Sequence, residues 1–167
     1  SLLATTLGEP VYAKAGFKKE LDYIYLQHTR PVYKTDQTIL SFNNRYQNQL
    51  LELDRSVSGE DRALLLMPHI QDSRIILEQE NISGFYLPTL GEGLVVANNT
   101  KTGLVLLSER LSLEKNRIAL PAENTSALDF LTNLGYSEFL RGSRMYLGQK
   151  LSWQPSKIYS RIGGNLG

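Results

Sequence analysis

The fold of this chain is decided by residues 118–140, which read IALPAENTSALDFLTNLGYSEFL. The apolar start predicts a short strand, and residues 125–134 predict a helix. Gly135 permits the left-handed backbone that commonly ends a helix, and the aromatic Tyr136 follows it. Residues 137–147 then read as a long strand. The stretch is therefore a strand, a helix, a glycine stop, an aromatic residue and a second strand.

The same pattern occurs at residues 2–26, which read LLATTLGEPVYAKAGFKKELDYIYL. Superposing Gly16 on Gly135 aligns Tyr12 with Leu131 and brings the aromatic positions together. The first copy lacks the hydrophobic strand that precedes the helix of the second copy, so we expect it to hold only a helix and a strand. The chain is therefore expected to begin in the middle of a domain.

Composition excludes several classes of function. A length of 167 residues allows one domain, or one domain plus a fragment, and the apolar fraction of 41% can form a core. A net charge of +1 gives no support for nucleic acid or an acidic membrane as principal partner. The chain has no cysteine, which removes disulfides and thiolate chemistry. His28 and His69 lie too far apart in the sequence to predict a metal site. Without a signal peptide or a long apolar run, a bacterial, cytoplasmic protein is expected.

The remaining residues alternate between helical and extended patterns. We expect a helix in two pieces over residues 39–67, strands at 74–80 and 85–90 joined by a turn at 81–84, a strand at 94–97, a helix over 101–115 and a last strand near 158–159. An antiparallel meander followed by crossover helices predicts an α/β (α+β) fold: a mixed, mostly antiparallel sheet with helices on both faces.

This order resembles the GNAT acetyltransferase superfamily. The resemblance rests on Gly8, Pro10, Tyr12 and Gly16-Phe17 in the first copy, and on Gly59-Glu60-Asp61-Arg62, Pro121, Asn124, Ala127, Arg144-Met145 and Gly148 further on. The second half looks like the C-terminal domain of a bacterial tandem-GNAT protein. That likeness implies a remnant (helix and strand) of a preceding GNAT domain at residues 1–27, a linker at 28–38 and a complete GNAT-like domain at 39–167.

The resemblance implies an N-acetyltransferase that passes an acetyl group from acetyl-CoA directly to an amine, here an unknown one. In the family two central strands splay apart, the pantetheine of the cofactor pairs with one of them, and its pyrophosphate lies at a helix N-terminus. A tyrosine often serves as general acid. Tyr12 stands at that position and is the candidate general acid of the preceding domain, acting only in the full-length protein. The alternative is a core tyrosine.

In the second copy Leu131 replaces this tyrosine, and leucine has no proton to give. The resemblance still implies weak candidate sites, each with a plainer alternative. Residues 99–103 are a cofactor-binding helix terminus or an ordinary N-cap, Glu92 is a catalytic base or a turn carboxylate, and Arg144 is a substrate-binding or a structural arginine. The residues meant at the helix terminus are Asn99, Thr100, Lys101, Thr102 and Gly103.

We therefore expect the chain to be the weak or inactive C-terminal portion of an acetyltransferase. The alternatives are a non-catalytic GNAT-like domain for ligand binding, cleft formation or dimerisation, and a second acetyltransferase site. Expected partners are a small-molecule or peptide amine, with no nucleic acid and no membrane. The strand at residues 21–26 is expected to pair with the C-terminal sheet or with a second copy of the chain, which would give a homodimer.

Overall fold

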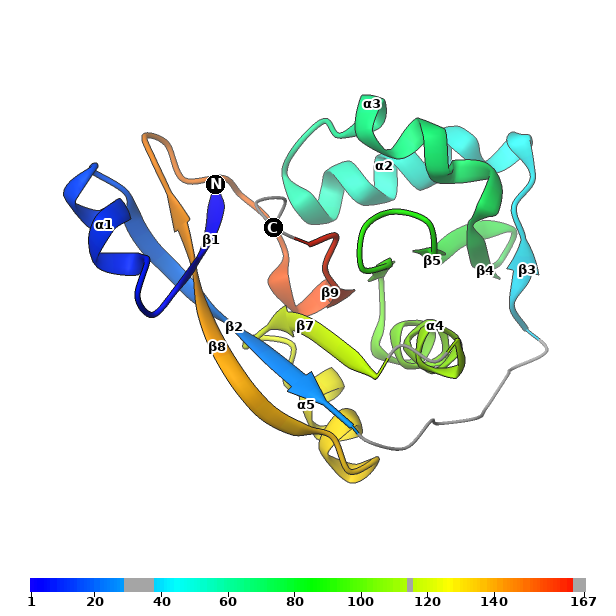
Figure 1. The fold of residues 1–167 in the computed structure, drawn as a ribbon. Helices are drawn as coiled ribbons and strands as arrows, with labels where there is room; N and C mark the ends of the chain where they lie inside the picture. Colours follow the sequence, from blue (N-terminus) through cyan, green and yellow to red (C-terminus); the bar gives the residue numbers. More distant parts are fainter. Residues whose placement is uncertain (29–37, 114–115, 164–167) are drawn as a thin grey trace.

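The computed structural model describes residues 1–28, 38–113 and 116–163. It has the mixed α/β architecture that the sequence predicts, with two sheets and helices on both faces (Figure 1). The strands are β1 (Leu2–Thr5), β2 (Lys18–Gln27), β3 (Leu40–Ser41), β4 (Arg74–Glu78), β5 (Asn81–Leu87), β6 (Leu94–Ala97), β7 (Arg117–Pro121), β8 (Ser137–Tyr146) and β9 (Ile158–Ser160). The α-helices are α1 (Glu9–Lys14), α2 (Gln47–Ser58), α3 (Ala63–Leu66), α4 (Thr100–Ser112) and α5 (Thr125–Asn133), with short 3₁₀ helices at Asn44–Tyr46, Met67–Asp72 and Pro155–Lys157.

The two copies of the repeat interlock in one four-stranded sheet, ordered β1-β8-β2-β7. The first copy is β1-α1-β2 and the second is β7-α5-β8, so the second strand of each copy lies between the two strands of the other. All three pairings are antiparallel, and Tyr23 lies opposite Gly142 near the middle of the central pair. The long β2 and β8 run side by side along the whole sheet (Figure 1).

The first copy contains a first strand, which was not expected from its sequence. Leu2–Thr5 forms β1 and pairs with β8 from Leu2↔Met145 to Thr5↔Gly142. Four residues are too few to show a strand periodicity, and the strand that pairs with them lies about 140 residues away in the sequence. The expected pairing of residues 21–26 with the C-terminal sheet is confirmed, because β2 contacts both β7 and β8. Of the expected linker, residues 29–37 lie outside the described part.

The second sheet has the order β3-β4-β5-β6-β9. Strand β5 is buried on both faces, because α2 covers one face and α4 the other. Gly84 of β5 allows that approach: a Cβ there would lie 2.7 Å from Thr102 Cγ2 and 2.9 Å from Leu106 Cδ1 of α4. The expected turn at residues 81–84 is therefore wrong. The turn is Gln79-Glu80, two residues at φ 50° and 66°.

The start of the first long helix also differs from the expectation. Residues 40–41 form β3, and the side chain of Asn43 accepts a hydrogen bond from Arg45 N at 3.0 Å, which begins the helical segment there. The glycine stops of the repeat are confirmed, since Gly16 and Gly135 have φ of 92° and 88°.

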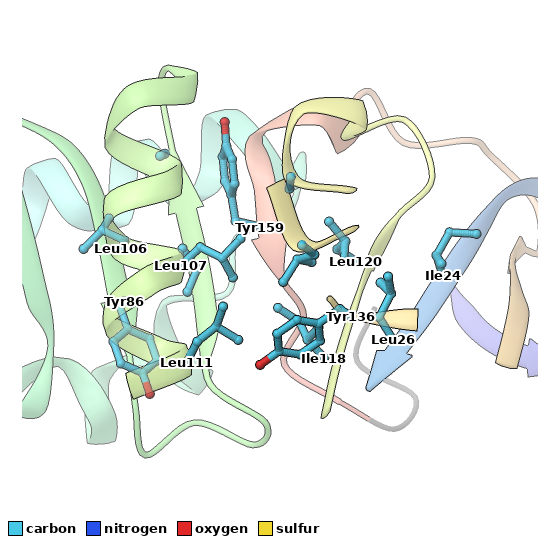
Figure 2. Packing of buried hydrophobic residues seen from close by; sticks show 14 of the residues in the cluster. Ile24, Leu26, Tyr86, Leu106, Leu107, Leu111, Ile118, Leu120, Tyr136 and Tyr159 are labelled. Carbon is cyan, nitrogen blue, oxygen red and sulfur yellow. The ribbon is translucent and has the colours of Figure 1, made fainter. Parts of the chain in front are cut away.

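The short strand β9 lies between the two sheets. It pairs with β6 at Val95↔Ser160 and Val96↔Ile158, and Arg161 N donates to Ala119 O of β7 at 3.1 Å. Tyr159 of β9 joins the core cluster, in which Leu107 and Leu111 lie on the side of α4 that faces β7 (Figure 2). The segment 158–161 therefore joins the β6 sheet to the β7 sheet.

Candidate functional site

The edge of β6 that faces β7 is occupied by the chain itself. Asn124, at the start of α5, donates from Nδ2 to Ile158 O at 3.0 Å, and this bond is buried. Ile158, Tyr159 and Ser160 are all at most 3% exposed. The backbone of β6 therefore already has a strand partner at the position where another extended molecule would have to pair.

Tyr159 covers the first turn of α4. Its ring lies directly against Gly103, and a side chain at residue 103 would overlap the ring. The pKa of the Tyr159 hydroxyl is raised by burial, which outweighs the opposing hydrogen bond with the Thr100 side chain. The missing Cβ of Gly103 is thus what allows β9 to lie against this helix.

The N-terminus of α4 carries its own cap and its own anion. Asn99 Oδ1 accepts from Thr102 N at 2.9 Å, so the N-cap reading of this residue holds structurally. Asn99 Nδ2 donates to Glu78 Oε1 and to Ser83 Oγ, both at 3.0 Å, and Thr102 Oγ1 donates to Glu78 Oε1 at 3.1 Å. The hydrogen bond from Asn99 and the lesser ones from Thr102 and Ser83 lower the pKa of the Glu78 carboxyl. Lys101 is exposed beside this group.

Tyr12 and Leu131 occupy equivalent places in the two copies but different surroundings. Tyr12 is half-buried on α1, and its ring meets Phe17 edge to face with centroids 5.7 Å apart. Leu131 is fully buried on α5, where its carbonyl accepts from Tyr136 N at 3.0 Å. The first copy has the matching hydrogen bond, in which Tyr12 O accepts from Phe17 N at 3.0 Å. The second copy therefore keeps the helix end of the first without its hydroxyl.

Arg144 is held inside the protein. Its guanidinium forms an ion pair with Glu20, both side chains being 2% exposed, and it lies 4.1 Å from the ring centroid of Trp153. Nη2 of Arg144 also donates to Ser1 Oγ at 3.1 Å, and Trp153 Nε1 donates to Glu20 Oε1 at 2.9 Å. These contacts are those of the structural alternative that the sequence left open.

Glu92 lies in a wall of a cavity, beside the residues that follow β9. Both carboxylate oxygens accept from Arg161, at 2.5 Å and 3.1 Å. Glu92 O accepts from Arg110 Nη2 at 3.0 Å, and Glu92 N donates to Ile162 O at 2.6 Å. The carboxylate is thus oriented by a bidentate ion pair and is 41% exposed.

The cavity itself was not anticipated from the sequence. It has a volume of about 480 Å³ and is lined by Arg110, Arg117, Arg161, Glu92, Tyr25 and Phe139, with Ile118, Asn116 and Gly91. We call it the arginine cavity. Its arginines come from α4, β7 and the segment after β9, so no local motif marks them.

Two absences apply to residues 1–28, 38–113 and 116–163. They contain no group of three or more His, Asp or Glu side chains that could hold a metal ion. They also contain no helix long and apolar enough to cross a membrane. His69 Nδ1 instead lies 2.9 Å from Thr89 Oγ1, and the His28 ring packs on Tyr136 with centroids 5.1 Å apart.

Comparison with known families gives a match over residues 50–160 to the family described as Acetyltransferase (GNAT) domain. This match covers two thirds of the chain. The chain belongs to the GNAT acetyltransferase family. The GNAT core of this protein thus includes α2, the β4–β6 meander, α4, β7, α5, β8 and β9, and the match ends on β9 itself.

Individual relatives agree with this GNAT assignment. The Bacillus subtilis (strain 168) protein named Uncharacterized N-acetyltransferase YitH is 28% identical over 186 residues, covering 99% of this chain and 64% of that protein. A solved structure of a putative acetyltransferase from Pyrococcus horikoshii has a TM-score of 0.82 at 23% identity, over 99% of this chain and 59% of that one. A GCN5-related N-acetyltransferase from Sphaerobacter thermophilus has a TM-score of 0.56 at 14% identity, over 91% and 61%. The chain therefore spans about 60% of the length of these relatives.

For a GNAT domain, the residues at the expected cofactor position do not fit the cofactor. β9 is already paired with the edge of β6, the Tyr159 ring lies on Gly103, and the Glu78 carboxylate lies beside the N-terminus of α4. A second anion at that helix terminus would meet like charge at short range. Asn99 to Gly103 thus have structural partners of their own, and Glu92 and Arg144 lie in two further, separate places.

Proposed function

We propose that the full-length protein transfers an acetyl group from acetyl-CoA to an amine, and that this chain supplies a GNAT domain that does not itself hold the cofactor. The observation that carries the proposal is β9, which pairs with β6 and places Tyr159 on the first turn of α4. Leu131, which stands in place of a tyrosine, also supports the proposal, because leucine cannot donate a proton.

In this proposal the catalytic centre belongs to the domain of which residues 1–27 are the closing part. Tyr12 is its general acid and gives its hydroxyl proton to the leaving group as the amine attacks. General acid catalysis by a positioned side chain typically contributes about 10²–10⁴-fold to a rate. The C-terminal domain would then form one wall of the substrate cleft, as part of a tandem arrangement of two GNAT domains.

Calorimetric titration of acetyl-CoA tests the proposal. We expect no saturable heat with this chain up to about 1 mM cofactor, a concentration that would reveal a binding free energy near −4 kcal/mol. The full-length protein should bind one equivalent. If the chain bound acetyl-CoA saturably, and if Lys101→Gln weakened this binding while the control Lys157→Gln did not, the proposal of a C-terminal domain without cofactor would be refuted. A second acetyltransferase site would then be favoured.

A second candidate is a ligand-binding role for the C-terminal domain, and the arginine cavity favours it.

Dimerisation is a further proposal, for which β1 offers an unpaired edge among the described strands, whereas β2 has strands on both sides. A small-molecule or peptide amine remains the proposed substrate class. Sedimentation velocity of this chain would find a concentration-dependent dimer if the β1 edge is used.

A further inference from the structure

The arginine cavity has a positively charged wall. Among the described residues, its charged lining consists of Arg110, Arg117, Arg161 and Glu92, which is three guanidinium groups against one carboxylate. Glu92 is already taken up by Arg161 in a bidentate pair, and Arg161 Nη1 also donates to Tyr25 at 3.0 Å. Among the described residues, neither Arg110 nor Arg117 forms a salt bridge of its own, although the Glu92 charge acts on Arg110 from nearby.

Arg110 is the unusual member of this group, because it is 1% exposed. Its Nη2 donates to the carbonyl oxygens of Glu92 and Arg117, each at 3.0 Å, which fixes the guanidinium between the two segments. Its Nε and Nη1 have no hydrogen-bond partner among the described residues. Burial lowers the pKa of this guanidinium by more than the nearby Tyr86 and Glu92 raise it, which reflects the cost of desolvating the cation. An anion in the cavity would offset that cost.

Arg117 and the aromatic residues determine which kind of anion fits. Arg117 is exposed at the start of β7, and its guanidinium lies 5.3 Å from the ring centroid of Phe139. The rings of Tyr25 and Phe139 meet edge to face, with centroids 6.3 Å apart. Burial raises the pKa of the Tyr25 hydroxyl, so it stays protonated at neutral pH. Ile118 adds an apolar surface. The cavity thus combines planar guanidinium groups with an apolar face. The negative charge of Glu92 disfavours a ligand with two negative charges.

We propose that the arginine cavity binds a small monoanionic carboxylate with an apolar or aromatic body. The carboxylate lies beside Arg110 and Arg117, and the body lies against Tyr25, Phe139 and Ile118. Arginine forks match carboxylates with two parallel hydrogen bonds, which is the recognition mode expected here. A volume of about 480 Å³ accommodates a ligand of this size. The proposal is independent of where acetyl transfer occurs.

The test is a calorimetric titration of this chain with phenylacetate, without acetyl-CoA. We expect saturable 1:1 binding below about 10 mM. Arg117→Gln should weaken it at least about tenfold, because charge-assisted hydrogen bonds to a carboxylate are lost. Arg117 is exposed, so this variant should fold normally. Arg110→Met should weaken binding further, with circular dichroism to establish that it remains folded.

Arg55→Gln is the matched control, since Arg55 is an exposed arginine of α2 that pairs with Asp61 outside the cavity. It should bind phenylacetate as the unaltered chain does. The uncharged analogue phenylacetamide should bind at least about tenfold more weakly. The proposal is overturned by absent saturation, by equal affinity in Arg117→Gln, or by equal affinity for phenylacetamide. Tighter binding of inorganic phosphate than of phenylacetate would overturn the assignment to a carboxylate.

Discussion

Arg144 illustrates how one residue connects three distant parts of the sequence. It belongs to β8, its ion-pair partner Glu20 belongs to β2, and Trp153, which covers it, belongs to the segment before β9. Lys150 lies 3.4 Å from the same carboxylate. Charges this deeply buried are retained only when they are paired, because desolvation costs several kcal/mol per ion.

Arg144→Met should therefore lower the free energy of unfolding by about 3 kcal/mol, since the buried Glu20 carboxylate would keep only the exposed Lys150 and the Trp153 hydrogen bond. Urea denaturation measures this change. Arg55→Met is the control at an exposed pair and should cost less than about 1 kcal/mol. The double variant Glu20→Gln with Arg144→Met should recover part of the loss. A cost below 1 kcal/mol for Arg144→Met would argue against a structural role and return it to the substrate-binding candidates.

Tyr12 makes a prediction for the full-length protein. Tyr12→Phe removes the proton but keeps the ring contact with Phe17, so kcat should fall about 10²-fold with the Kd for acetyl-CoA nearly unchanged. Steady-state kinetics and calorimetry together measure both quantities. Tyr146→Phe, at the end of β8, is the control and should leave kcat unaltered. Unchanged turnover in Tyr12→Phe would remove this residue from the mechanism.

Glu78 predicts a pH dependence. Its pKa is lowered in the folded protein, chiefly by the Asn99 hydrogen bond, so its stabilising contribution is present above its unfolded pKa, about 4.3. The contribution is lost as the pH falls through the lower, folded value. Between pH 6 and pH 3 the Tm of the unaltered chain should fall by more than that of Glu78→Gln. Glu52→Gln, an exposed residue of α2, should follow the unaltered chain; identical Tm losses in all three would contradict the prediction.

At the scale of elements, α4 and β9 depend on each other through Gly103. An alanine is favoured over glycine inside a helix by about 1 kcal/mol, but its Cβ would overlap the Tyr159 ring, and overpacking costs about 1–3 kcal/mol. Gly103→Ala should therefore be destabilising in this chain. In a Tyr159→Ala background the same change should be stabilising, because only the helix preference remains. Urea denaturation of the unaltered chain, the two single variants and the double variant gives both values, and a stabilising Gly103→Ala alone would mean that β9 does not pack as described.

The elements also differ in how far their sequences specify them. The capped helix α4 and the glycine-ended α1 and α5 follow from local hydrogen bonding, and the sequence predicts all three. The Gln79-Glu80 turn does not follow, because neither residue favours a positive φ. The pairing of β4 with β5 imposes that conformation. It keeps Gly84 inside β5, where the missing Cβ lets α4 approach the strand.

At the scale of the whole molecule, the interlocked repeat makes residues 1–27 part of the C-terminal sheet. Ile24 and Leu26 of β2 are at most 4% exposed and belong to the same core cluster as Leu107 and Leu120. Figure 2 shows these side chains from β2 and β7 grouped in one interior. The remnant and the domain that the sequence separates therefore share one core.

We expect the fragment 39–167 to lose its cooperative unfolding, because β8 would lose both of its strand neighbours, β7 would lose β2, and the shared core would be exposed. Thermal denaturation followed by circular dichroism measures this. Adding a peptide of residues 1–28 should restore the transition, whereas the same peptide with Ile24→Asp should not. A fragment that melts as sharply as the whole chain would establish residues 39–167 as an independent domain.

The sequence alone determined the repeat, the helix caps and stops, the mixed α/β class and the likeness to GNAT acetyltransferases, because these depend on periodicity and on hydrogen bonds between near neighbours. It could place Tyr12, Glu92, Arg144 and the α4 terminus as candidates, but not their surroundings. Only the tertiary structure decided that β9 takes the edge of β6 and that Arg110, Arg117 and Arg161 meet in one cavity. Those residues lie on separate elements, and what joins them is long-range strand pairing and burial, which leave no local mark on the sequence.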